Sequence, residues 1–189
     1  IILVDVTAAG KITTAGNVTL YSGHNTGESA KTLTVTSAST GETAAFFVGS
    51  GATFTLASGV MKAATSWVKG IIRVNGTFNL IGGEVSADHM TSDDYAVYSS
   101  GSSGGHVNIS GGKITSTKSA LYSSGYLSIT GGEIISDSRY GMSIGINRAD
   151  TVIKDCIIRN NSTSAGSYGV ATSGSYNLTF ENVQIIGGY

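Results

Sequence analysis

Residues 95–134 read YAVYSSGSSGGHVNISGGKITSTKSALYSSGYLSITGGEI and contain nearly the same phrase twice. Tyr98 opens a Tyr-Ser-Ser-Gly motif that is followed by a short apolar alternation and a Gly-Gly pair, and Tyr122 opens the same order again. The two copies begin about two dozen residues apart, an interval typical of structural repeats that stack on one another.

The alternating phrase occurs eight times along the chain, starting at residues 18, 33, 54, 78, 107, 127, 151 and 178. A second β-rich phrase closed by glycine precedes most copies, and a third follows the Gly-Gly corner as EVSA, KITS and EIIS. No segment has the apolar periodicity of a helix. Three short strands per repeat, apolar at alternate positions, predict an all-β fold: a single-stranded right-handed parallel β-helix (β-solenoid) of about eight coils.

Alternation also predicts which apolar side chains point into the stack on each of three faces. The first face is expected to bury Phe54, Leu56, Phe78, Leu80, Val107, Ile109, Leu127, Ile129, Ile153, Leu178 and Phe180. The second is expected to bury Val85, Ile114, Ile134, Ile158 and Ile185. The third is expected to bury Ile72, Val74, Val97, Leu121, Met142 and Val170.

The composition is that of a folded chain, with 189 residues, 40% of them hydrophobic and 12% charged. Proline is absent although there are 27 glycines, which indicates that backbone N–H groups are committed to hydrogen-bond ladders. A net charge of −1 without a basic run argues against nucleic acid as a partner, and the short apolar opening argues against membrane insertion. We interpret residues 1–189 as one domain cut from a longer chain, with residues 1–50 as less regular coils or a cap and residues 51–189 as regular coils.

Two C-terminal phrases, TVIKDCIIRNN and NLTFENVQI, each combine a strand with a polar corner. Asp155 and Asn182 take the corner, while Cys156 and Val183 take the following inward place. These phrases resemble coils of the pectin-lyase-like right-handed parallel β-helix superfamily, and GTFNLIGGEVSA and GYLSITGGEIIS resemble the Gly-Gly-rich β-helix repeats of large bacterial surface proteins. That superfamily includes lyases, hydrolases, phage tailspikes, adhesins and sugar binders, so the resemblance implies the fold and leaves the function open.

Exposed aromatic side chains are the candidate ligand-binding residues. If the inward assignments hold, Tyr98 and Tyr122 point outward on adjacent coils with Arg73 one coil earlier, and His106 and Tyr126 form a second outward pair. Flat exposed rings next to hydroxyl-bearing residues suit sugar rings. The alternative is that neighbouring rings stack on each other and stabilise the sheet.

A further tyrosine column is expected at an inward corner, where it would be structural. Its members are Tyr95, Tyr140 and Tyr168.

An enzymatic alternative places a polar cluster on one edge of the stack. Its candidate catalytic residues are Asp88, Asp94, Asp137 and Arg139, with His89, Asp93 and Lys118 nearby. Acidic polysaccharide lyases that resemble this fold use carboxylate-bound Ca²⁺ and an Arg or Lys base, so Ca²⁺ is the one cofactor that this alternative implies. The competing interpretation is a solvated polar loop.

A second group of charges, Glu84, Lys113 and Glu133, is expected to stack outward on consecutive coils. The lysine between two carboxylates favours a surface charge ladder over a glycosidase pair. The three histidines have no metal-ligand spacing, and Cys156 is expected to be a packing residue, so no metal site or resident cofactor is predicted.

These features together favour a non-catalytic extracellular module of a bacterial surface or secreted protein, with a stalk or adhesion role and polysaccharide as the candidate ligand. The first alternative is a polysaccharide lyase or glycoside hydrolase of the same fold. The second is a phage tail or self-assembling fibre segment, since open strand edges favour end-to-end or lateral association.

Overall fold

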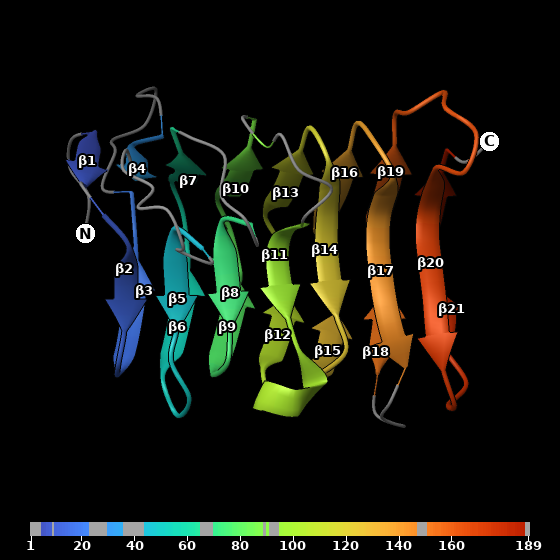
Figure 1. Ribbon diagram of the computed structural model, residues 1–189, viewed down its shortest axis with the longest axis horizontal. Coiled ribbons are helices and arrows are strands. Elements are labelled where there is room, and N and C mark those ends of the chain that lie inside the picture. The colour runs from blue at the N-terminus through green and yellow to red at the C-terminus, as the bar shows by residue number, and fades with distance from the viewer. Residues whose placement is uncertain are drawn as a thin grey trace.

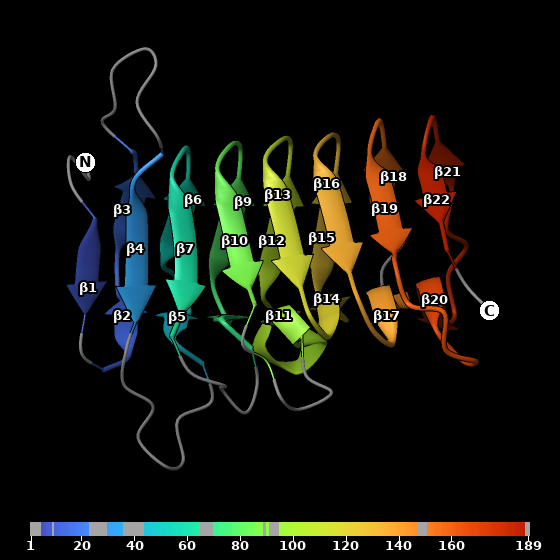
Figure 2. The same ribbon diagram turned by 90° about the horizontal axis from the view of Figure 1, so that it is seen from above.

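The computed structural model describes residues 5–8, 10–22, 30–35, 44–64, 70–88, 90, 95–146 and 151–187. In these residues the chain winds into a rod of stacked coils, and each complete coil contributes one strand to each of three sheets (Figures 1 and 2). All strand pairs are parallel, as stacking of successive coils requires. The predicted all-β parallel solenoid with three strands per coil is therefore confirmed.

Sheet I contains eight strands, in the order β1 (Val6–Ala8), β4 (Thr32–Val35), β7 (Val60–Ala63), β10 (Glu84–Ala87), β13 (Lys113–Ser116), β16 (Glu133–Ser136), β19 (Ile157–Asn160) and β22 (Gln184–Ile186). Sheet II contains seven, namely β2 (Ile12–Thr14), β5 (Phe46–Val48), β8 (Ile72–Val74), β11 (Tyr95–Ser99), β14 (Ser119–Ser123), β17 (Tyr140–Ile146) and β20 (Tyr168–Gly174). Sheet III contains seven, namely β3 (Asn17–Leu20), β6 (Thr53–Leu56), β9 (Thr77–Leu80), β12 (His106–Ile109), β15 (Tyr126–Ile129), β18 (Val152–Lys154) and β21 (Phe180–Glu181). The predicted eight coils slightly overstate the stack, because sheets II and III hold seven strands each in the described residues.

The helical content of the described residues is one turn of 3-10 helix, η1 (Gly101–Ser103), at a corner between sheets II and III. No helix in the described part of the chain is long and apolar enough to cross a membrane.

The core runs along the axis of the rod, and the predicted inward residues of the central coils are buried. Phe78 is fully buried and its ring stacks on that of Phe54, with centroids 6.0 Å apart. The last strands differ from the prediction, because Phe180 is 37% exposed and Ile185 is 46% exposed. These residues lie on β21 and β22, each of which has a neighbouring strand on one side only.

The corner between sheets III and I needs a left-handed backbone conformation in successive coils. Gly112 has a φ of 74°, and a Cβ there would lie 2.7 Å from the carbonyl oxygen of Gly83 in the preceding coil. In the last two coils Asp155 and Asn182 have φ values of 53° and 52°, and the Asn182 side-chain amide donates to Asp155 Oδ1 at 2.8 Å. Asp and Asn are the residues besides glycine that tolerate this conformation best, so the predicted corner role is confirmed.

The interior of sheet II contains a polar interruption. Val74, Ser99, Ser123 and Ile144 follow one another in register on consecutive coils, and both serines are fully buried. Their hydroxyl oxygens have no hydrogen-bond partner in the described part of the structure. Alternation along the strands accounts for the inward direction of these two serine side chains. It does not explain why polar residues occupy these buried positions.

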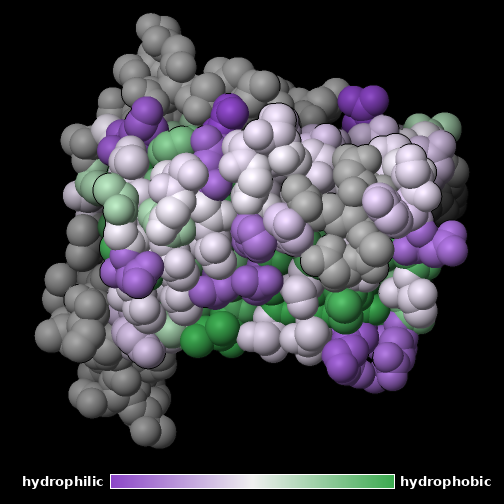
Figure 3. Space-filling view, turned by 90° about the horizontal axis from the view of Figure 1, so that it is seen from below, coloured by the Kyte–Doolittle hydropathy of each residue, from purple (hydrophilic) through white to green (hydrophobic). Residues whose placement is uncertain are grey.

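The side of the rod turned away from the viewer in Figure 2 is mostly neutral to hydrophilic, with small apolar areas (Figure 3).

Candidate functional site

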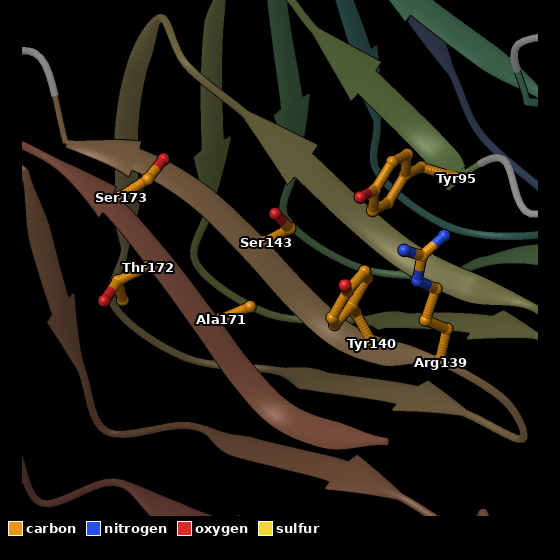
Figure 4. A pocket seen from close by; sticks show the side chains of 7 residues that line it. All are labelled: Tyr95, Arg139, Tyr140, Ser143, Ala171, Thr172 and Ser173. Atoms are coloured by element: carbon orange, nitrogen blue, oxygen red, sulfur yellow. The ribbon is translucent and has the colours of Figure 1, made fainter. Parts of the chain in front are cut away.

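A hollow of about 270 Å³ lies on the outer side of sheet II, toward its C-terminal end (Figure 4). Its lining comes from the start of β11, from the residue before β17, from the start and middle of β17, and from the second half of β20. The lining residues are Tyr95, Arg139, Tyr140, Ser143, Ala171, Thr172 and Ser173. We call this the tyrosine–arginine hollow.

Tyr95 forms one wall of the hollow by leaning along the rod axis. It starts on β11, passes Tyr122 of β14 with ring centroids 5.2 Å apart, and hydrogen-bonds with Ser143 of β17. Burial raises the pKa of the Tyr95 phenol, and although the bond with Ser143 and the charge of Arg139 act in the opposite direction, the net shift is upward. The phenol therefore keeps its proton at neutral pH and can both donate and accept a hydrogen bond.

Arg139 and Tyr140 form the adjacent wall. The guanidinium carbon of Arg139 lies 5.0 Å from the centroid of the Tyr140 ring, within the range of a cation–π contact. Tyr140 in turn stacks on Tyr168 of the next coil at 6.1 Å with an angle of 12° between the rings. These contacts hold a planar set of N–H donors beside the hollow.

Hydroxyl groups surround the space between these walls. Ser143 pairs in register with Ala171, and the side chain of Ser173 lies on the same side of β20 as that of Ala171, whereas Thr172 between them points the other way (Figure 4). In Figure 4 the hydroxyls of Tyr95 and Tyr140 point to the same side of the hollow as Ser143. The arrangement combines aromatic edges, hydroxyls and a guanidinium, which can hydrogen-bond a polyhydroxylated ligand.

The tyrosines of this hollow correct the sequence analysis. Tyr95 and Tyr140 are half-buried and Tyr168 is 49% exposed, so the predicted inward column is wrong. Each of the three is the first residue of its strand, where the chain has just turned a corner and strict alternation does not yet hold. The adjacency of Arg139 and Tyr140 was the signal in the sequence, but the partner Tyr95 is more than forty residues away.

The predicted outward residues of the first aromatic set lie in register on sheet II. Arg73 pairs with Tyr98, and Tyr98 pairs with Tyr122. The guanidinium carbon of Arg73 is 5.8 Å from the Tyr98 centroid, and the two tyrosine rings stack at 4.9 Å. Because Tyr98 is flanked by a guanidinium and a ring, and Tyr122 contacts two tyrosines, this geometry favours stabilisation of the sheet over sugar stacking.

The second predicted pair, His106 and Tyr126, lies on the outer face of sheet III. The two rings stack at 4.0 Å with 12° between their planes. They border a hollow of about 220 Å³ whose other lining residues are Asn108, Leu127 and Ser128. This pair therefore combines rings and polar side chains at one place.

The enzymatic cluster is brought together only in part. Asp88 accepts a hydrogen bond from Ser86, and Asp137 accepts one from Asn161 at 2.9 Å. Thr117 lies between the two aspartates on the intermediate coil, which separates their backbones by roughly 9.6 Å at the usual strand spacing of about 4.8 Å. Arg139 lies over Tyr140 in the tyrosine–arginine hollow. Asp94, with His89 and Asp93, lies outside the described residues.

The other charged and metal-binding candidates have structural surroundings. Glu84, Lys113 and Glu133 pair in register as predicted, and Thr115 donates to Glu84 Oε1 at 2.7 Å. Cys156 is buried as expected for a packing residue, and burial raises the pKa of its thiol to about 11. In the described ranges no three His, Cys, Asp or Glu side chains gather in a way that could hold a metal ion.

Comparison of the chain with models of protein families, with curated proteins and with solved structures finds no match.

Proposed function

We propose that this chain is a non-catalytic extracellular module of a bacterial surface or secreted protein, and that it binds polysaccharide in the tyrosine–arginine hollow. The observation that carries the proposal is the convergence of Tyr95, Tyr140 and Ser143 hydroxyls with the Arg139 guanidinium at one open site. Sugars offer closely spaced hydroxyls that both donate and accept, which such a lining complements.

The position of the hollow suits a stalk or adhesion role. Its lining residues come from the outward side of sheet II, so a ligand can reach it along the side of the rod. The Asp155 and Asn182 corners and the inward Cys156 also support assignment of the chain to the pectin-lyase-like β-helix superfamily, which we include in the proposal.

A lyase or glycosidase role has less support from the geometry. Glycoside hydrolysis uses two carboxyl groups that flank the scissile bond. The described residues that line the hollow include no carboxylate, and Asp88 and Asp137 lie in the turns after β10 and β16, where each accepts a hydrogen bond and a threonine lies between them.

The test is a screen of the purified chain against immobilised neutral and acidic polysaccharides, followed by titration of the best ligand. Ala171 pairs in register with Ser143 and points into the hollow, so Ala171→Trp fills it with a bulky side chain, whereas Ala165→Trp makes the same change at an exposed position outside it (Figure 4). We expect Ala171→Trp to weaken binding at least about tenfold, equivalent to about 1.4 kcal/mol, and Ala165→Trp to leave it unchanged.

A second pair of variants removes single phenol hydroxyls from one strand. Tyr95→Phe deletes a hydroxyl of the hollow, and Tyr98→Phe deletes one outside it. Equal affinity of Ala171→Trp and wild type, or no binding to any polysaccharide, contradicts the proposal. If ultraviolet absorbance shows that unsaturated uronates are formed, the chain is a lyase and the proposal of a non-catalytic module is wrong.

A further inference from the structure

The outer face of sheet III carries two columns of polar and aromatic side chains. Strand register places them one per coil along the rod axis. The first column is Asn17, Thr53, Thr77, His106 and Tyr126, and the second is Thr19, Thr55, Asn79, Asn108 and Ser128. All ten are half-buried or exposed, and none is Asp, Glu, Lys or Arg.

Hydrogen bonds along the second column fix the orientation of its amides. Asn108 Nδ2 donates to Asn79 Oδ1 at 2.9 Å, and Asn79 Nδ2 donates to Thr55 Oγ1 at 3.2 Å. Each amide uses one N–H in this ladder, and an amide group has a second N–H and two carbonyl lone pairs. Successive coils, about 4.8 Å apart, therefore present donors and acceptors in a preorganised row.

The first column ends in the stacked rings of His106 and Tyr126. These rings border the hollow that Asn108 and Ser128 of the second column also line. A ring pair at the end of a row of amides and hydroxyls offers one apolar contact and several hydrogen bonds to a ligand that lies along the axis. The lack of Asp, Glu, Lys and Arg in both columns complements a neutral ligand.

We propose that sheet III is a second polysaccharide-binding surface, which holds an extended neutral glycan chain parallel to the rod axis. The binding row runs from Thr55 through Asn79 and Asn108 to the hollow at Tyr126 and Ser128. This surface lies on a different sheet from the tyrosine–arginine hollow, so the inference does not depend on the function proposed for that hollow. With both surfaces occupied, one module bridges two glycan chains.

The experiment is a titration of the purified, ¹⁵N-labelled chain with cellohexaose and with chitohexaose, followed by two-dimensional NMR. The expected result is a shift of the side-chain amide signals of Asn79 and Asn108 with at least one of the two probes. Ser128→Trp, which fills the hollow, is expected to weaken that binding at least about tenfold. Asn108→Ala, which removes one amide from the ladder, is expected to weaken it roughly fivefold to tenfold.

Two controls separate this surface from the rest of the molecule. Ser164→Trp makes the same change as Ser128→Trp at an exposed position outside both hollows, and Ala171→Trp blocks the tyrosine–arginine hollow. Both should leave the amide shifts and the affinity for the hexasaccharide unchanged. If neither hexasaccharide shifts the two amides, or if Ala171→Trp abolishes binding while Ser128→Trp does not, the second surface is refuted, and the latter result supports the hollow on sheet II.

Discussion

Replacing the buried Ser123 by alanine should make the protein more stable. Ser123 is fully buried, and its hydroxyl has no hydrogen-bond partner in the described part of the structure. Burying a hydroxyl without a partner costs about 1–3 kcal/mol. The substitution removes that hydroxyl and keeps the Cβ, so it leaves at most a very small cavity between Ser99 and Ile144, its neighbours in register.

The expected gain is about 1 kcal/mol, the lower end of that range, because the lost oxygen also made packing contacts. For a chain of 189 residues this corresponds to a rise in Tm of roughly 2–4 °C.

Ser116 provides the matched control, since it is also buried at the end of a strand. Its Oγ accepts a hydrogen bond from the Lys118 N–H at 3.0 Å and lies 3.5 Å from the sulfur of Met90. Ser116→Ala should therefore lower stability by about 1 kcal/mol.

The assay is thermal and urea unfolding of wild type and both variants, followed by circular dichroism. A single cooperative transition with an unchanged urea slope allows the midpoints to be compared as free energies. Opposite signs for the two serines support the reasoning. A fall in Tm for Ser123→Ala equal to that of Ser116→Ala would refute it, because the Ser123 hydroxyl would then have a stabilising partner.

Two further outcomes follow from the corner geometry and from the buried thiol. Gly112→Ala should lower stability more than Gly104→Ala. Both residues have positive φ (74° and 69°), but only at Gly112 would a Cβ lie 2.7 Å from a carbonyl oxygen. Urea unfolding midpoints of the two variants measure the difference, and equal losses would contradict the expectation. The Cys156 thiol has its pKa raised to about 11 by burial, so the unfolded thiol ionises first and stability should fall as pH rises from about 9 to about 11. Cys156→Ala should lack that part of the alkaline loss when midpoints at about pH 8 and pH 10.5 are compared, and an unchanged pH dependence would show that the thiol is not responsible.

The regular part of the fold was predictable because its information is local and repeated. Alternation predicted the burial of residues such as Leu80 and Ile109 from their own strands, and the repeat phrase predicted the parallel register that brings Tyr98 next to Tyr122. The same register predicted the pair His106 and Tyr126. In each case one strand is stacked on an equivalent strand, so a position within the phrase is enough to identify the neighbour.

The tyrosine–arginine hollow was not predictable in this way, because corners break the alternation on which the prediction depends. Tyr95 is the first residue of β11, and its side chain crosses the strand of the next coil to reach Ser143 on β17. Arg139 lies in the same turn as Asp137, and its guanidinium lies over the ring of its sequence neighbour Tyr140, a contact that the repeat phrase does not predict. Side-chain direction at a corner depends on the conformation of the turn and on neighbours two coils away. The repeat phrase in the sequence predicts neither of them.

The sequence by itself determined the repeat, the three-sided parallel stack, the buried apolar columns and the polar corners at Asp155 and Asn182, because strand periodicity and left-handed turns are properties of a few adjacent residues. Only the tertiary structure decided which exposed side chains meet. Tyr95 and Arg139 are far apart in the chain and converge because coils stack, and the amides of Asn79 and Asn108 share one orientation because each can hydrogen-bond the coil before it.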